Sequence, residues 1–148
     1  YHGETDTAGS RSRARAVPDL EQYHKTHTFL SDALTLEAGK EIEKAVAEKK
    51  PFYLNMAHYA VHSPFETDER FISHYTDPNK SQQARAFATL IEGMDKSLGD
   101  ILDKLEDMGI AENTLIIFLG DNGGDAPLGD AADYGSSAPF KGKKRIGI

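Results

Sequence analysis

Two short polar runs carry side chains that can bind a metal ion or move a proton. In the first, Asp121 and Asn122 follow the apolar residues 115–119 and Gly120. A carboxylate and an amide carbonyl are hard oxygen ligands of the kind that Ca²⁺ and Mg²⁺ prefer. The same letters followed by two glycines also form ordinary turns. The pair therefore predicts either a divalent-metal site or a turn. An EF-hand fits poorly, because Ala126 and Ala132 replace its required Gly and closing Glu.

The second run contains His58 and His62, which follow the mostly apolar residues 52–57. Two histidines four residues apart occur on the helix of zinc proteases. Here, however, Tyr59 stands in place of the catalytic Glu, and Pro64 disfavours a helix. Two interpretations remain for each histidine. It is a packed or capping side chain, or it is a general acid or hydrogen-bond donor that reaches a substrate from a loop.

A basic patch lies near the end of the chain. Residues 140–148 contain no acid, and their cations are Lys141, Lys143, Lys144 and Arg145. Such a patch is most often solvated. Beside a divalent metal, a cation of this kind can instead stabilise charge on a group that is being transferred.

Hydrophobic periodicity indicates which elements position these residues. A helix is expected from a cap at Ser31 or Asp32 to Lys50, where Pro51 stops it. A longer amphipathic helix is expected from the cap Ser81 to Gly109. A short helix is expected at 68–75, a turn at 77–79, and buried strands at 52–57 and 115–119. The order helix, strand, helix, strand predicts an α/β fold with a mostly parallel sheet flanked by helices.

The domain organisation follows from the same pattern. Residues 1–30 are expected to form a polar arm or loop, and residues 31–148 the folded part. In open α/β sheets, sites form beyond the carboxyl ends of strands, which is where both polar runs lie. The arginines at 11, 13 and 15 suit either a surface arm or an anion-binding arm.

Composition excludes several classes of function. The 148 residues contain no Cys, so disulfides, thiolate metal sites and a Cys nucleophile are absent from the chain. The net charge of −7 disfavours a nucleic-acid partner. No apolar run reaches the roughly 18 residues that a membrane span needs.

Four stretches taken together resemble the sulfatase family of the alkaline-phosphatase-like superfamily. They are residues 50–64 (KPFYLNMAHYAVHSP), 90–95 (LIEGMD), 113–123 (NTLIIFLGDNG) and 139–144 (PFKGKK). The last is similar to the family's Pro-Leu-Arg-Gly-x-Lys segment. The resemblance implies that the chain is part of an alkaline-phosphatase-like α/β sandwich. It also implies a hydrolase that acts on aryl or carbohydrate sulfate esters.

The resemblance also implies roles for individual residues. Asp121 and Asn122 match the family's calcium ligands. His62 matches the histidine that contacts the sulfate ester, where it is a candidate general acid for the leaving alcohol. Lys144 matches the lysine that binds the sulfate and the leaving oxygen, with Lys143 as the rival if the register slips by one. His58 matches a more variable position, to which no role is carried over.

The chain also departs from the family pattern. Family sulfatases attack sulfur with a formylglycine hydrate made in an upstream Cys/Ser-x-Pro-x-Arg segment, which this sequence lacks. The upstream paired aspartates and the Tyr-Glu-Gly-Gly run that usually follows Lys144 are also missing. We therefore expect an internal fragment of a sulfatase, inactive alone, whose partner is the rest of that protein.

Two alternatives to a sulfatase remain open. One is a phosphonate or phosphodiester hydrolase of the same superfamily. The other is a non-catalytic module that binds an anion or calcium. The resemblance suggests an extracytoplasmic location, because related sulfatases are commonly exported or lysosomal.

Overall fold

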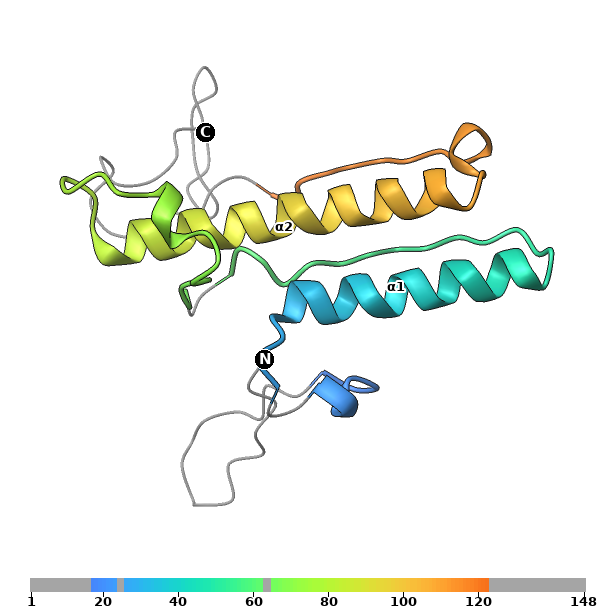
Figure 1. Ribbon diagram of the computed structural model, residues 1–148, viewed down its shortest axis with the longest axis horizontal. Helices are drawn as coiled ribbons and strands as arrows, with labels where there is room; N and C mark the ends of the chain where they lie inside the picture. The colour runs from blue at the N-terminus through green and yellow to red at the C-terminus, as the bar shows by residue number, and fades with distance from the viewer. Residues whose placement is uncertain (1–16, 24–25, 63–64, 123–148) are drawn as a thin grey trace.

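The computed structural model describes residues 17–23, 26–62 and 65–122. Two α-helices dominate this part of the chain (Figure 1). They are α1 (Leu30–Ala47) and α2 (Gln82–Asp107). Three single turns of 3₁₀ helix accompany them: η1 (Glu21–Tyr23), η2 (Ile72–His74) and η3 (Ala111–Asn113).

The two helices lie side by side and run in the same direction. Thr35 meets Ser97 near the start of α1, and Glu43 binds Lys104 near its end. Small side chains make most of the buried contact, so the helix axes come close together with little apolar volume between them. The buried positions are Ala33, Thr35, Ala38, Gly39 and Ile42 on α1, and Ala84, Ala86, Thr89, Gly93, Ser97 and Leu105 on α2.

At three of the four helix ends, residues close in the sequence explain where the helix begins or ends. Ser81 caps α2 as predicted, and its Oγ accepts a hydrogen bond from the Ala84 amide at 3.0 Å. Gly109 has a φ of +67° and ends α2 with a hydrogen bond from its amide to the Glu106 carbonyl, as expected. α1 ends at Ala47, shortly before Pro51.

The predicted start of α1 is wrong. The N-cap is Phe29, whose side chain makes no capping hydrogen bond, and Ser31 and Asp32 lie inside the first turn. The reason is tertiary, because the Asp32 carboxylate binds the guanidinium of Arg70 at 2.9 Å. The predicted short helix at 68–75 is also only the single turn η2.

Each long helix is followed by an extended segment that returns along it. Residues 51–59 return along α1 and residues 114–120 along α2, so the two segments run in the same direction (Figure 1). Side-chain exposure alternates as it does in a strand. Tyr53 is 92% exposed but Phe52 and Leu54 only 38%, and Leu115 is 86% exposed but Ile116 only 43%.

The prediction of two buried strands is nevertheless not confirmed. The residues that the structure describes contain no strand, and most apolar side chains of both segments are exposed. A strand exists only when a neighbour pairs with its backbone, and neither segment has such a neighbour in the described ranges. The described residues therefore contain the helical layer of the expected α/β fold but not its sheet.

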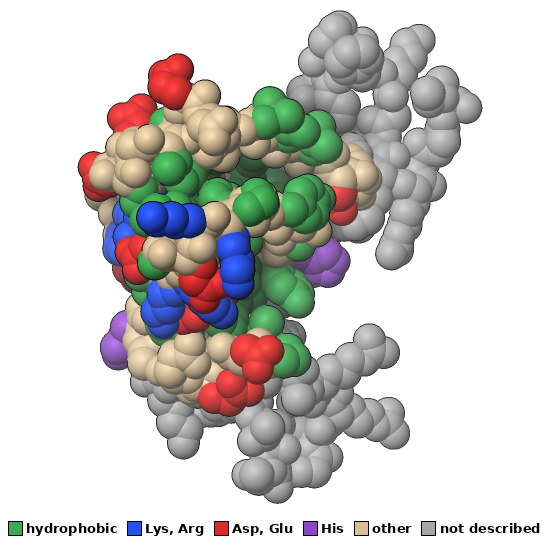
Figure 2. Space-filling view, turned by 90° about the vertical axis from the view of Figure 1, so that its right-hand side faces the viewer, with side chains coloured by type: hydrophobic (Ala, Val, Ile, Leu, Met, Phe, Trp, Pro, Cys, Tyr) green, Lys and Arg blue, Asp and Glu red, His purple; other side chains and the backbone are tan. Residues whose placement is uncertain are grey.

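The sequence of α2 and its C-cap carries a stripe of apolar residues at helical spacing, which we expect to face the core. Its members are Phe87, Ile91, Met94, Leu98, Ile101, Leu105 and Met108. The stripe is less buried than this expectation implies. Leu105 is buried, but Ile91 is 42% exposed and most of the other stripe residues are only half-buried. The face of α2 that carries small side chains packs against α1. The large apolar side chains of α2 therefore lie at the edge of this interface. In Figure 2, hydrophobic side chains gather toward the right and charged side chains toward the left. No helix in the described ranges is long and apolar enough to span a membrane.

We expect the 148-residue polypeptide to self-associate when it is expressed alone. The extended segments expose apolar side chains and unpaired backbone groups, a combination that favours edge-to-edge association. Light scattering should show concentration-dependent oligomers that bind a hydrophobic dye. The double substitution Leu115→Lys and Leu119→Lys should weaken both signals. Leu36→Lys, at an exposed position on α1, should change them much less. A monodisperse monomer with a steep thermal transition would contradict this expectation.

Candidate functional site

His62 lies in a turn at the end of the first extended segment. Its backbone amide donates a hydrogen bond to the Tyr59 carbonyl at 2.9 Å, which closes the turn. The residue is exposed. A substrate can therefore approach its side chain, which a general acid or hydrogen-bond donor requires.

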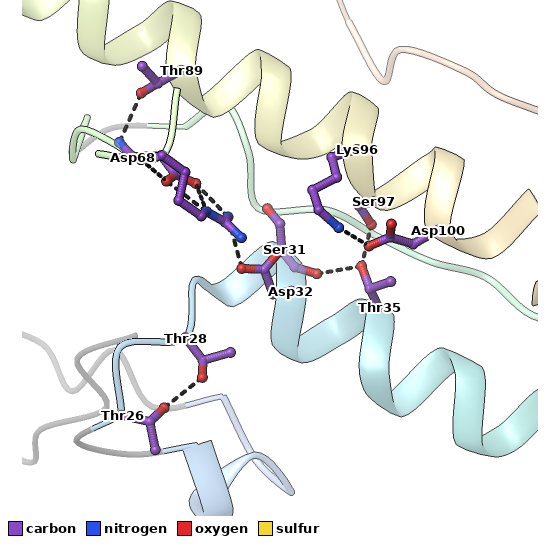
Figure 3. Close-up of polar contacts among 11 residues, drawn as sticks. Thr26, Thr28, Ser31, Asp32, Thr35, Asp68, Thr89, Lys96, Ser97 and Asp100 are labelled. Atoms are coloured by element: carbon purple, nitrogen blue, oxygen red, sulfur yellow. Dashed lines mark hydrogen bonds and ion pairs between the residues drawn. The ribbon is translucent and has the colours of Figure 1, made fainter. Parts of the chain in front are cut away.

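His58 lies near the end of the first extended segment, is half-buried and contacts α2. Its Nε2 lies 3.4 Å from the Ser97 hydroxyl of α2. That hydroxyl also makes a short contact with the Thr35 hydroxyl of α1, and Thr35 in turn donates to the Ser31 carbonyl at 2.7 Å (Figure 3). We call the group Thr35, Ser97 and His58 the hydroxyl junction.

Proton counting assigns the tautomer of His58. The Thr35 proton is used on the Ser31 carbonyl, so Ser97 must donate to Thr35 and can only accept from His58. The imidazole therefore carries its proton on Nε2, and Nδ1 keeps a lone pair. Nδ1 is buried and has no hydrogen-bond partner among the described residues. Burial lowers the pKa of His58 below its ordinary value of 6.5, because a charged ring would be desolvated there.

A second junction lies a few residues beyond His62. The Asp68 carboxylate is 98% buried and accepts hydrogen bonds from Arg70 Nε at 2.9 Å and from the Arg70 terminal nitrogen at 2.6 Å. The same terminal nitrogen binds Asp32 of α1 at 2.9 Å. The Asp68 amide donates to the Thr89 hydroxyl of α2 at 3.0 Å (Figure 3). We call Asp32, Asp68, Arg70 and Thr89 the arginine junction.

The guanidinium of Arg70 is further held by two aromatic rings. It lies 5.4 Å from the ring centroid of Phe29 and 5.1 Å from that of Phe71. Its two carboxylate partners raise the pKa of Arg70, so the group is charged at every accessible pH. The sequence analysis missed both junctions. The spacing Asp68-x-Arg70 is a local signal, but their partners on α1 and α2 cannot be read from it.

Asp121 and Asn122 lie exposed at the end of the second extended segment. Their side chains meet, and the Asn122 amide nitrogen donates to Asp121 Oδ1. The donor set suits a hard cation, since one carboxylate and one amide oxygen are available after the amide turns over. It is also incomplete, because the described residues contain no group of three or more His, Asp or Glu side chains that could hold a metal ion. The metal role of the pair therefore stays a prediction.

Three of the four predicted site residues lie in the described ranges. The two extended segments run in the same direction, and both end on the side from which α1 starts, alongside α2 (Figure 1). His62 follows the end of the first segment in the sequence, and the pair Asp121–Asn122 follows the end of the second. Lys144, its rival Lys143 and the arginines at 11, 13 and 15 lie outside the described residues.

Comparison with known proteins decides the family. The family profile described as Sulfatase matches residues 4–146. The chain belongs to the sulfatase family. The resemblance that the four sequence motifs carry is thus confirmed. The family implies an alkaline-phosphatase-like α/β fold, in agreement with the predicted class, although the described residues provide only its helices.

Individual relatives cover most of this sulfatase-family chain. N-acetylgalactosamine-6-sulfatase of Canis lupus familiaris is 32% identical over 115 residues, which are 78% of this chain and 20% of that protein. Lipoteichoic acid synthase-like YvgJ of Bacillus subtilis is 29% identical over 133 residues, which are 86% and 21% of the two chains.

Solved structures agree with these relatives. The crystal structure of Ps i-CgsB in complex with k-i-k-neocarrahexaose matches with a TM-score of 0.63 and 31% identity. The match covers 66% of this chain and 22% of that one. The sulfatase-family chain thus spans about a fifth of the length of the relatives that it matches.

The burial of His58 predicts how stability depends on pH. Because its pKa is lowered in the folded state, the unfolded chain binds a proton at a pH where the folded chain does not. The stabilisation that this causes is complete above about pH 6.5 and is lost as the pH falls further. Thermal melting of the full-length protein and of His58→Gln should show this. The difference in Tm between them, wild type minus variant, should shrink from pH 7.5 to pH 5.5. A difference that stays constant would contradict the burial of a neutral His58.

Proposed function

We propose that the full-length protein containing this chain hydrolyses sulfate esters. The observation that carries the proposal is the placement of His62 and Asp121–Asn122 after two extended segments that run in the same direction, in a chain of the sulfatase family. Sites of α/β folds form at such carboxyl ends. The hydrolase class follows from the family, and the steps below are our proposal for this chain.

Asp121 and Asn122 are the residues that would hold a calcium ion. Both side chains are exposed and already touch, so a modest rotation of the Asn122 amide brings two oxygens together. Bound calcium would supply positive charge that orients the non-bridging oxygens of the sulfate group. The remaining ligands have to come from residues outside the described ranges.

His62 acts on the leaving group in this proposal. Cleavage of the ester leaves negative charge on the bridging oxygen, and a protonated imidazole aimed at that oxygen donates its proton to the departing alcohol. Lys144 would stabilise the same charge through its ammonium group. In this proposal the nucleophile is the formylglycine hydrate that the family resemblance implies. It would come from outside the 148 residues, which contain neither Cys nor a Ser-x-Pro-x-Arg segment.

A sulfated carbohydrate is the substrate class that the relatives favour. One relative is named N-acetylgalactosamine-6-sulfatase, and one solved structure holds k-i-k-neocarrahexaose. We therefore propose a sulfate ester on a sugar hydroxyl as the natural substrate, with aryl sulfates as convenient test compounds.

Substitution of His62 tests the proposal directly. In the full-length protein, His62→Gln should lower kcat for an aryl sulfate by about 10²–10⁴-fold, because the leaving oxygen loses its proton donor. The matched control is His74→Gln, which replaces an exposed histidine that binds Glu92. The control should keep kcat within about twofold. Full activity of His62→Gln would remove His62 from the site.

Metal removal tests the role of Asp121. Chelation should abolish hydrolysis, and added calcium should restore it. Asp121→Ala should raise the calcium concentration needed for half-maximal activity by about tenfold or more, since the site loses its carboxylate. Asp107→Ala, which removes an exposed carboxylate at the end of α2, should not. An unchanged calcium requirement in Asp121→Ala would rule out this ligand.

A second candidate reaction is hydrolysis of phosphonate or phosphate diesters. One relative over 86% of the chain is named lipoteichoic acid synthase-like, not sulfatase. Relative kcat/KM values on matched sulfate and phosphate esters separate the two reactions. A preference for phosphodiesters by orders of magnitude would replace the sulfatase proposal. Binding of sulfate or calcium without turnover of either ester would favour the non-catalytic module.

A further inference from the structure

The turn that carries His62 lies between two fixed points on the chain. Upstream, His58 enters the hydroxyl junction through the Ser97 contact. Downstream, Phe65 packs edge-on against Phe87 of α2, with ring centroids 5.3 Å apart. Asp68 then enters the arginine junction. These contacts hold the chain on both sides of the His62 turn.

Both junctions are attached to the same rigid pair of helices. Thr35 and Asp32 lie one turn apart on α1, and Ser97 and Thr89 lie two turns apart on α2 (Figure 3). Residues one or two helical turns apart share a face. The His62 turn is therefore tied at both ends to the face where α1 meets α2, and its position depends on that interface.

Arg70 connects the turn to α1 more directly than any other described side chain. It binds the buried Asp68 through two nitrogens and Asp32 through one of them. Bidentate guanidinium–carboxylate pairs fix direction as well as distance. The buried Asp68 carboxylate would be left without its cation if Arg70 were removed, so the downstream anchor would have to rearrange.

A similar ion pair at the far end of the helices offers a comparison. Lys104 of α2 binds Glu43 of α1, and this pair also joins the two helices. It lies near the helix C-termini, whereas the arginine junction lies near the start of α1. Removing Lys104 thus weakens the same helix–helix interface without touching the His62 turn.

We propose that Arg70 and Ser97 are positioning residues, which hold the turn bearing His62 through the two junctions. This inference rests on the proposed sulfate-ester hydrolysis. Neither residue contacts the substrate. Each acts through His62, so its substitution should lower kcat only in an enzyme that retains His62.

Kinetics of the full-length enzyme test the inference. Arg70→Met should lower kcat by about tenfold to a hundredfold, because a displacement of the order of 1 Å is enough for such a loss. KM should change by less than about threefold. Arg70→Lys should recover part of kcat, since it restores the charge without the bidentate geometry. Lys104→Met should keep kcat within about twofold.

A double-mutant cycle separates positioning from plain stability. When His62→Gln is already present, Arg70→Met should lower the residual kcat by less than about twofold, because the two residues act as a unit. A structural role would give the same fold-loss in both backgrounds and would overturn the inference. An equal loss in Lys104→Met would also overturn it. Ser97→Ala supplies the same cycle through the other junction if Arg70→Met fails to fold.

Hydrogen exchange gives a readout that needs no activity. The His62 amide, which donates to the Tyr59 carbonyl, should exchange at least about tenfold faster in Arg70→Met and Ser97→Ala than in wild type or Lys104→Met. Unchanged exchange would overturn the inference. If the wild-type protein hydrolyses no sulfate ester but exchange responds as expected, the proposed function fails while the anchoring of the turn stands.

Discussion

The close packing of α1 on α2 through small side chains is the contact on which the rest of the described structure depends. Alanine, glycine, serine and threonine bring the two helices together, and the Thr35–Ser97 contact with the Glu43–Lys104 pair fixes them as parallel. Parallel helices send both following segments back in the same direction (Figure 1). Both segments end on the side from which α1 starts, and His62 and Asp121–Asn122 follow these ends in the sequence.

The interface between α1 and α2 buries little apolar volume, which limits the hydrophobic contribution to the free energy of unfolding. The buried hydrophobic residues in the described ranges are mostly alanines, joined by Leu20, Ile42 and Leu105. The large apolar side chains lie instead on the extended segments and the edge of α2. Each would contribute about 1.5–3 kcal/mol when fully buried. Most of the hydrophobic stabilisation that this sequence can supply is thus unused by the described residues. Pairing of both segments into a sheet would bury these side chains.

Local signals in the sequence predicted both ends of α2 correctly. Ser81 and Gly109 define the ends of α2 through contacts within a few residues of themselves. Asp32 was misjudged as a cap because its partner, Arg70, lies 38 positions away in the chain. The strands were predicted from apolar runs, yet pairing is a property of neighbours and not of the run itself. The candidate site residues were predicted from motifs, whereas the two junctions depend on contacts between segments that are distant in the sequence.

Backbone geometry places the two histidines, His58 and His62, in different environments. In the extended segment, even-numbered positions from Phe52 onward face the helices, and His58 falls on that inner side. Its ring is therefore half-buried and hydrogen-bonded to Ser97, and desolvation lowers its pKa. The chain then turns, and the His62 amide donates a hydrogen bond to the Tyr59 carbonyl. Within this turn, side chains no longer alternate between facing the helices and facing solvent. The turn leaves His62 exposed, while the contacts of His58 limit how far that exposed residue can move.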